Sequence, residues 1–169
     1  MADAATMTMK AVLLPDEIQA TLKDLTFAYT PADASEKWFF GLVNVTTSSN
    51  DLISGDFLVN SAGTDTSDGG VGTADISVSD KVKFLFIKNT ASRTGSDSTT
   101  DGVMLLTDGG VVAHGVTNGI WIGTGESWYA KLPNTTVGDL HVRTTLADIS
   151  NVGGGDVQCI VAAIIDDVA

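Results

Sequence analysis

The chain has 169 residues, 43% of them hydrophobic and 18% charged, a balance that supports one folded domain with its own core and excludes a disordered polymer. Its formal net charge of -12 repels phosphate backbones and anionic lipid headgroups, so we expect neither nucleic acid nor a membrane as partner. No apolar run reaches the roughly 18 residues of a membrane helix, and the N-terminus lacks the early basic residue and the long apolar stretch of a signal peptide.

The first patterned segment, PDEIQATLKDLTFAY, fits two kinds of element. Ile18, Leu22 and Leu25 recur at helical spacing, whereas Leu25, Phe27 and Tyr29 alternate as in a strand. We predict a strand for the second half of the segment. A single helical turn at its start stays open, because proline and acidic residues suit the first turn of a helix.

Short β-branched and aromatic stretches then alternate with clusters of Gly, Asp, Ser and Thr, at intervals of roughly ten to fifteen residues. This spacing is typical of an all-β sandwich or barrel with little helix. We predict about eight strands, with a ninth within residues 19–29. The eight are residues 37–46, 75–80, 81–90, 102–107, 119–122, 127–132, 139–145 and 157–165.

The strand at 157–165 is almost continuously apolar, so we expect it to be covered on both faces, in the centre of the core or under another subunit. It holds Cys159, the only cysteine, which we interpret as a core residue. The strand at 139–145 alternates instead, and we expect His141 and Arg143 on a face that meets water or a partner.

The stretch GIWIGTGESWYAKL, residues 119–132, contains two tryptophans and a tyrosine around a small polar turn. It completes neither phosphate-binding glycine motif, because Trp128 stands where the dinucleotide-binding motif needs its third glycine. We interpret it as the corner of a β-hairpin, with Gly123 and Gly125 in the turn and apolar residues on both arms.

A carbohydrate-binding module is an alternative of another class. Exposed Trp121, Trp128 and Tyr129 would then stack on sugar rings, with Glu126 as a hydrogen-bonding neighbour. Strand aromatics are more often buried in a core or a subunit interface, so burial of both tryptophans would remove the platform.

We expect no enzyme, no cofactor, and no catalytic or metal-binding residues. The two histidines, His114 and His141, lie in no catalytic motif, and we expect neither within hydrogen-bonding reach of a carboxylate in a cleft. Asp65, Asp68 and Asp75 lie in a loop with a calcium-like composition, but their spacing fits no calcium-binding motif. We interpret this as a solvated loop.

Four segments in order, VKFLFIKNTA, DGVMLLTDGG, GIWIGTGESWYAKLPNTTVGDLHV and VQCIVAAIIDDV, resemble small virion proteins of tailed bacteriophages, especially marine ones. The likeness covers about residues 80–168 and consists of strands and turns, without an active-site signature. It implies a single-domain antiparallel β-sandwich, often jelly-roll-like, that is present in many copies on a particle.

The resemblance implies a capsid decoration (cement) protein in the virion, assembled in the host cytoplasm; a tail or neck component is the alternative. Its partners would be the major capsid protein and copies of itself, as a homotrimer or a dimer. Residues 1–14 would form an extended arm that is buried only on docking, ahead of a sandwich domain at 15–169. The candidate interface residues are Met7, Met9, Val12, Leu13, Leu14, Trp121, Trp128 and Tyr129.

Overall fold

The computed structural model divides the chain into two compact units, Met1–Ala34 and Ser35–Ala169. Each unit is described by itself. The residues that the structure describes are 5–9, 25–32, 35–55, 76–95, 97–109, 119–144 and 155–167.

The first unit contains an antiparallel pair of strands, β1 (Ala5–Met9) and β2 (Leu25–Tyr29). The strand expected in the second half of residues 15–29 is therefore confirmed. Within the expected N-terminal arm, residues 5–9 are extended and pair with β2. The division into an arm of residues 1–14 and a domain of residues 15–169 stays a prediction.

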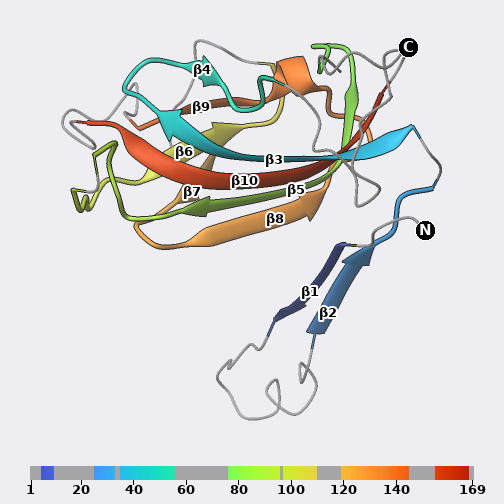
Figure 1. Cartoon of the computed structure of the whole chain (residues 1–169), viewed down its shortest axis with the longest axis horizontal. Coiled ribbons are helices and arrows are strands. Elements are labelled where there is room, and N and C mark those ends of the chain that lie inside the picture. The colour runs from blue at the N-terminus through green and yellow to red at the C-terminus, as the bar shows by residue number, and fades with distance from the viewer. Residues whose placement is uncertain are drawn as a thin grey trace. The chain divides into compact units, whose positions relative to one another are not determined.

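The second unit consists of two four-stranded antiparallel sheets, with strand orders β3-β10-β5-β8 and β4-β9-β6-β7 (Figure 1). The all-β prediction is confirmed. Helix is confined, in the described part of the unit, to the short 3-10 turn η1 (Val137–Asp139), and no described helix has the length and apolar character of a membrane span. The strands are β3 (Glu36–Val45), β4 (Asn50–Asp51), β5 (Lys81–Asn89), β6 (Val103–Leu106), β7 (Ile120–Ile122), β8 (Ser127–Lys131), β9 (His141–Arg143) and β10 (Val157–Asp166).

In this unit the strands pair from the two ends of the chain segment inward. The first strand pairs with the last, β3 with β10, and the next pairs inward are β4 with β9, β5 with β8, and β6 with β7. Two further contacts, β10 with β5 and β9 with β6, complete the sheets. As expected, the apolar strand at 157–165 is central, because β10 lies between β3 and β5.

The core lies between the two sheets, where alternate side chains of facing strands meet. Cys159 is fully buried there, which confirms its interpretation as a core residue, and desolvation raises the pKa of its thiol to about 12. Trp128 packs against the same cluster from the edge strand β8. Other members are Phe39, Val45, Leu52, Val82, Leu85, Ile87, Val103, Leu105, Ile122, Leu140, Val142, Val157, Val161 and Ile165.

The strand predicted at 75–80 is wrong for its described residues, because residues 76–80 form a turn. The Asp80 N–H donates to the Ser77 carbonyl oxygen (3.1 Å), and the Ser77 N–H donates to the Asp80 carboxylate (2.8 Å). These local bonds replace a strand ladder. The sequence also missed β4, whose two residues are too few for a periodic pattern.

The hairpin expected at residues 119–132 is wrong as well. β7 pairs with β6 and β8 pairs with β5, so the GTGES corner carries the chain from one sheet to the other. The turn itself is as expected: the Glu126 N–H donates to the Gly123 carbonyl oxygen (3.0 Å), and Gly125 has a positive φ of 73°. The Glu126 carboxylate accepts the Gly123 N–H at 2.8 Å and closes the turn.

Candidate interaction surface

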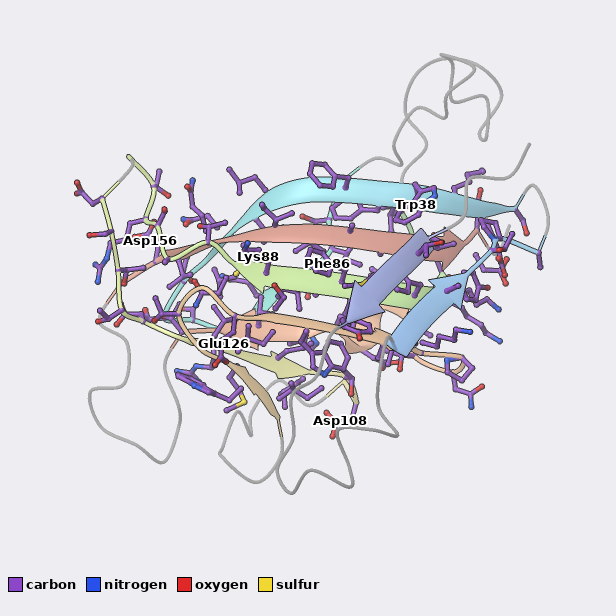
Figure 2. The ribbon with its side chains drawn as sticks, turned by 90° about the horizontal axis from the view of Figure 1, so that it is seen from below. Trp38, Phe86, Lys88, Asp108, Glu126 and Asp156 are labelled. Atoms are coloured by element: carbon purple, nitrogen blue, oxygen red, sulfur yellow. The ribbon has the colours of Figure 1, made fainter. Side chains whose placement is uncertain are left out.

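The outer face of the β3-β10-β5-β8 sheet is rich in apolar side chains. Strand alternation turns them away from the core, and cross-strand register places them in adjacent rows. Trp38, Phe86 and Lys88 are labelled along this sheet in Figure 2. The set, called the outer apolar face below, comprises Trp38, Phe40, Leu42, Phe84, Phe86, Tyr129, Ile160, Ala162 and Ile164.

Exposure differs across the outer apolar face. Phe40 and Leu42, on the edge strand β3, are 55% and 61% exposed. Phe84 and Ile164 are buried, and the Trp38 ring meets the Phe84 ring edge-on, with centroids 6.2 Å apart. Large apolar side chains that remain this exposed on one sheet mark a surface suited to contact with another molecule.

Two ion pairs lie at one end of this face, and Lys88 lies at the other end, opposite Ile160. Lys37 pairs with Asp167 (2.7 Å) and Lys83 pairs with Asp166 (3.0 Å), both next to the C-terminal end of β10. Partly exposed pairs of this kind contribute about 1 kcal/mol or less. The middle rows of β3 and β10 contain no charged residue.

A groove of about 520 Å³ runs along the outer edge of β3. Its walls are the edge strand itself and the segment around β4. The lining residues are Phe39, Phe40, Gly41, Leu42, Val43, Asn44, Asn50, Asp51 and Ser54.

The candidate residues near the N-terminus are only partly described. Met7 is half-buried in β1, opposite Phe27 in the register, and Met9 lies opposite Leu25. The remaining candidates of this segment lie outside the described residues; they are Val12, Leu13 and Leu14.

The structure does not bring the three candidate aromatics together. Trp121 is 42% exposed on the other sheet, and its ring lies against Gly102. Trp128 points into the core, whereas Tyr129 lies on the outer apolar face opposite Phe86. Because these side chains lie on the outer faces of two different sheets and in the core, they form no common platform for a sugar ring.

Sequence reasoning missed Phe40 and Leu42. The signal was present in KWFFGLVNVT, where both alternating sets of residues are largely apolar. Such a pattern predicts a strand covered on both faces, and only the sheet order shows that β3 is an edge strand.

The expectations for the histidines are partly overturned. His141 is buried, although we expected it on a face that meets water or a partner, and its Nδ1 lies 3.2 Å from the Asp51 carboxylate. Register explains the burial, because His141 lies opposite Leu106, which is itself fully buried. His114 lies outside the described residues, as do the candidate cation ligands Asp65, Asp68 and Asp75. Within the described ranges, no three His, Cys, Asp or Glu side chains are grouped as metal ligands would be.

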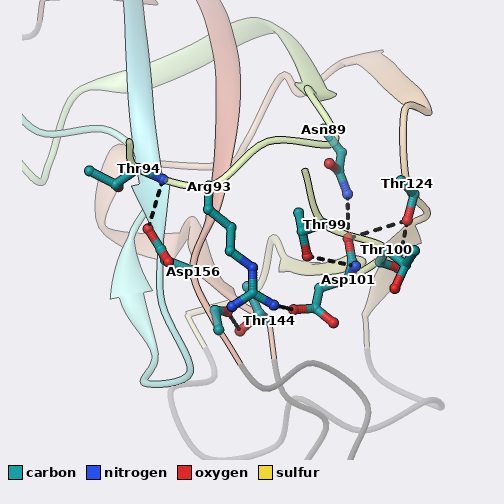
Figure 3. Close-up of polar contacts among 10 residues, drawn as sticks. Asn89, Arg93, Thr94, Thr99, Thr100, Asp101, Thr124, Thr144 and Asp156 are labelled. Atoms are coloured by element: carbon teal, nitrogen blue, oxygen red, sulfur yellow. Dashed lines mark hydrogen bonds and ion pairs between the residues drawn. The ribbon is translucent and has the colours of Figure 1, made fainter. Parts of the chain in front are cut away.

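Polar contacts fix the loop that follows β5 at the far end of the sandwich (Figure 3). The Asn89 side-chain amide donates to the Asp101 carbonyl oxygen (2.9 Å), and Arg93 pairs with the Asp101 carboxylate (2.9 Å). The Thr94 N–H donates to the Asp156 carboxylate (3.1 Å) and so connects this loop to the residue before β10. Hydrogen bonds from Thr94 lower the pKa of Asp156. These residues have structural partners, so they explain loop geometry without implying a ligand.

Comparison of the chain with family models, curated proteins and solved structures gave no match. The functional argument therefore depends on the residues of the chain and on their geometry.

Proposed function

We propose that this chain is a structural protein of a tailed-phage virion, a capsid decoration (cement) protein that binds the shell of major capsid protein as an oligomer. The main support is the outer apolar face, with Phe40 and Leu42 more than half exposed. A surface of this kind suits contact between proteins better than it suits water.

The energetics of such contacts fit a repeated structural role. Burying one large apolar side chain completely contributes about 1.5–3 kcal/mol, so a few side chains per copy give a modest contact. Symmetric repetition of the contact over a shell then multiplies the total stabilisation. A decoration protein needs no single strong site.

Topology adds support. We propose that the sandwich is a jelly roll, because its eight strands pair first with last and continue inward in the same way. Two Greek keys in eight strands are the hallmark of that architecture, which is found in viral capsid domains and also in lectins. The separation of Trp121 and Tyr129 onto different sheets, with Trp128 in the core, favours the structural role over a sugar-binding one.

The charge distribution suggests an orientation on the shell. The chain carries a net charge of -12, whereas the middle rows of β3 and β10 are uncharged. The outer apolar face would lie toward the shell, and the acidic surfaces elsewhere would face solvent and keep the particle soluble.

The experiment is a pelleting assay with shells that lack the protein and purified chain added back. Ala162→Asp, in the middle row of the outer apolar face between Phe40 and Phe86, is expected to weaken binding about 10-fold or more, because a carboxylate would be buried there among apolar side chains. Phe86→Ser, on the neighbouring strand, is expected to act in the same direction.

Val78→Asp is the matched control, since Val78 is 68% exposed in the turn before β5 and lies off this face. Thermal unfolding of each variant checks that the sandwich is intact. Unchanged binding by folded Ala162→Asp and Phe86→Ser proteins would refute the proposed docking face.

A further inference from the structure

We propose that two copies of this chain pair through their β3 edge strands, antiparallel and about a two-fold axis, so that two four-stranded sheets become one sheet of eight strands. The inference goes beyond the proposed function. It does not depend on a virion, because it concerns the purified chain alone.

Among the described strands of the sandwich, four lie at sheet edges, and they differ greatly in length (Figure 1). β4, β7 and β8 have two, three and five residues, whereas β3 has ten. Natural sheets protect their edges by keeping edge strands short, or by placing charges, prolines or bulges on them. Three edges of the sandwich are protected by their length, and β3 is not.

The middle of β3 has none of the other protective features either. Residues 38–46, WFFGLVNVT, include no charged residue and no proline, and the β3 register with β10 runs without a bulge. Within the described part of the chain, Phe39–Val43 make no backbone hydrogen bond apart from the β10 ladder. Alternate N–H and C=O groups of an edge strand point away from its one neighbour, into the groove along β3.

Electrostatics favour a second copy as the occupant of this groove. Two chains that each carry a net charge of -12 repel wherever carboxylates meet. The stretch of β3 itself brings no like charges together, and the carboxylate that lines the groove, Asp51, lies 3.2 Å from His141 Nδ1. A two-fold axis also requires that the same surface serve both partners, and it makes the paired strands antiparallel.

The sequence of β3 suits antiparallel pairing with the β3 strand of a second copy. With the axis at Gly41, Phe40 of each copy lies opposite Leu42 of the other, and each residue near the charged end meets a neutral one. Gly41 has no side chain to crowd the axis, where the two backbones come closest. The cross-strand pairs next to the axis are thus aromatic with aliphatic, a stabilising combination.

Pairing in this way would also extend the outer apolar face. Phe40 and Leu42 would stay on the outer side of the joined sheet, where the exposed rows of both copies form one strip. The dimer would therefore present about twice the apolar surface of one copy to a larger partner.

The test is the mass of the full-length chain in solution, measured by sedimentation velocity and light scattering. The wild-type protein is expected at twice the chain mass of 17.5 kDa. Phe40→Glu combined with Leu42→Glu places four carboxylates around the axis and is expected to raise the dimer dissociation constant about 100-fold or more. Both positions are exposed, so the sandwich itself should keep its fold.

A charge-complementing variant tests the register. Phe40→Lys combined with Leu42→Glu puts a lysine of each copy opposite a glutamate of the other, and dimers are expected to persist. Val78→Glu, a change at an exposed apolar residue away from β3, is the control and should remain dimeric. A wild-type monomer or trimer, or a dimer that survives the double glutamate change, would overturn the proposal.

Discussion

The two outer faces of the sandwich both carry apolar side chains, but the faces differ in how far these side chains are exposed to solvent. On the β4-β9-β6-β7 sheet, Met104 and Leu106 lie outside the core cluster and are nonetheless buried. On the β3-β10-β5-β8 sheet, Phe40 and Leu42 remain more than half exposed. An apolar residue on an outer face therefore indicates a contact with another molecule only where the chain leaves it uncovered.

The largest expected effect on stability distinguishes two leucine-to-alanine substitutions, one on each outer face. Leu106→Ala should lower the free energy of unfolding by about 2–5 kcal/mol, because it removes a fully buried side chain and leaves a cavity. Leu42→Ala should change that of the monomer by less than about 0.5 kcal/mol. Urea unfolding of both variants, under conditions where the protein is monomeric, measures the difference. Equal losses would show that the two faces are not distinct.

A smaller effect on stability is expected at Gly102, where the Trp121 ring lies against the backbone. A Cβ at Gly102 would overlap the Trp121 ring, so Gly102→Ala should displace the ring and cost about 1–3 kcal/mol of stability. Tryptophan fluorescence and urea unfolding report the two consequences. In a Trp121→Ala background the same glycine change should cost almost nothing, and a full cost there would locate the strain elsewhere.

The smallest effect concerns the interior between the two faces. Burial raises the pKa of the Cys159 thiol from its ordinary 9.0 to about 12, so the folded protein holds the neutral thiol. The stabilisation that results is complete below pH 9.0 and declines as pH rises from there toward 12, since the unfolded chain ionises first.

Native protein should thus resist alkylation at pH 8 and react only after denaturant is added. Cys159→Ala should show a shallower decline of stability above pH 9.0 than the wild-type protein. Rapid labelling of the native protein would contradict the burial of this strand.

The strands were predictable from sequence because burial leaves a periodic pattern. KVKFLFIKNT and VQCIVAAII are rich in β-branched and other apolar residues, which predicts strands, and both form inner strands of their sheet, β5 and β10. Pairing was not predictable at the GTGES corner, because a tight glycine turn serves a hairpin and a crossing between sheets equally well. Only the pairing of strands that are distant in sequence distinguishes a hairpin from a crossing between sheets.

The candidate surface was less predictable than the fold. Trp121, Trp128 and Tyr129 stand close together in sequence, yet successive strand residues point to opposite faces, and the strands here lie in different sheets. Phe40 and Leu42 became visible only when β3 proved to be an edge strand. The solvent exposure of a side chain depends on which other segments pack against it, and a local sequence pattern does not contain that information.

The proposed role as a capsid decoration protein is tested most directly by electron microscopy of intact phage particles purified from a source that encodes this chain. We predict density for the sandwich in many symmetric copies on the shell, with the outer apolar face turned toward the capsid protein. Absence of the chain from the particle, or an outer apolar face turned to solvent in every copy, would contradict the account.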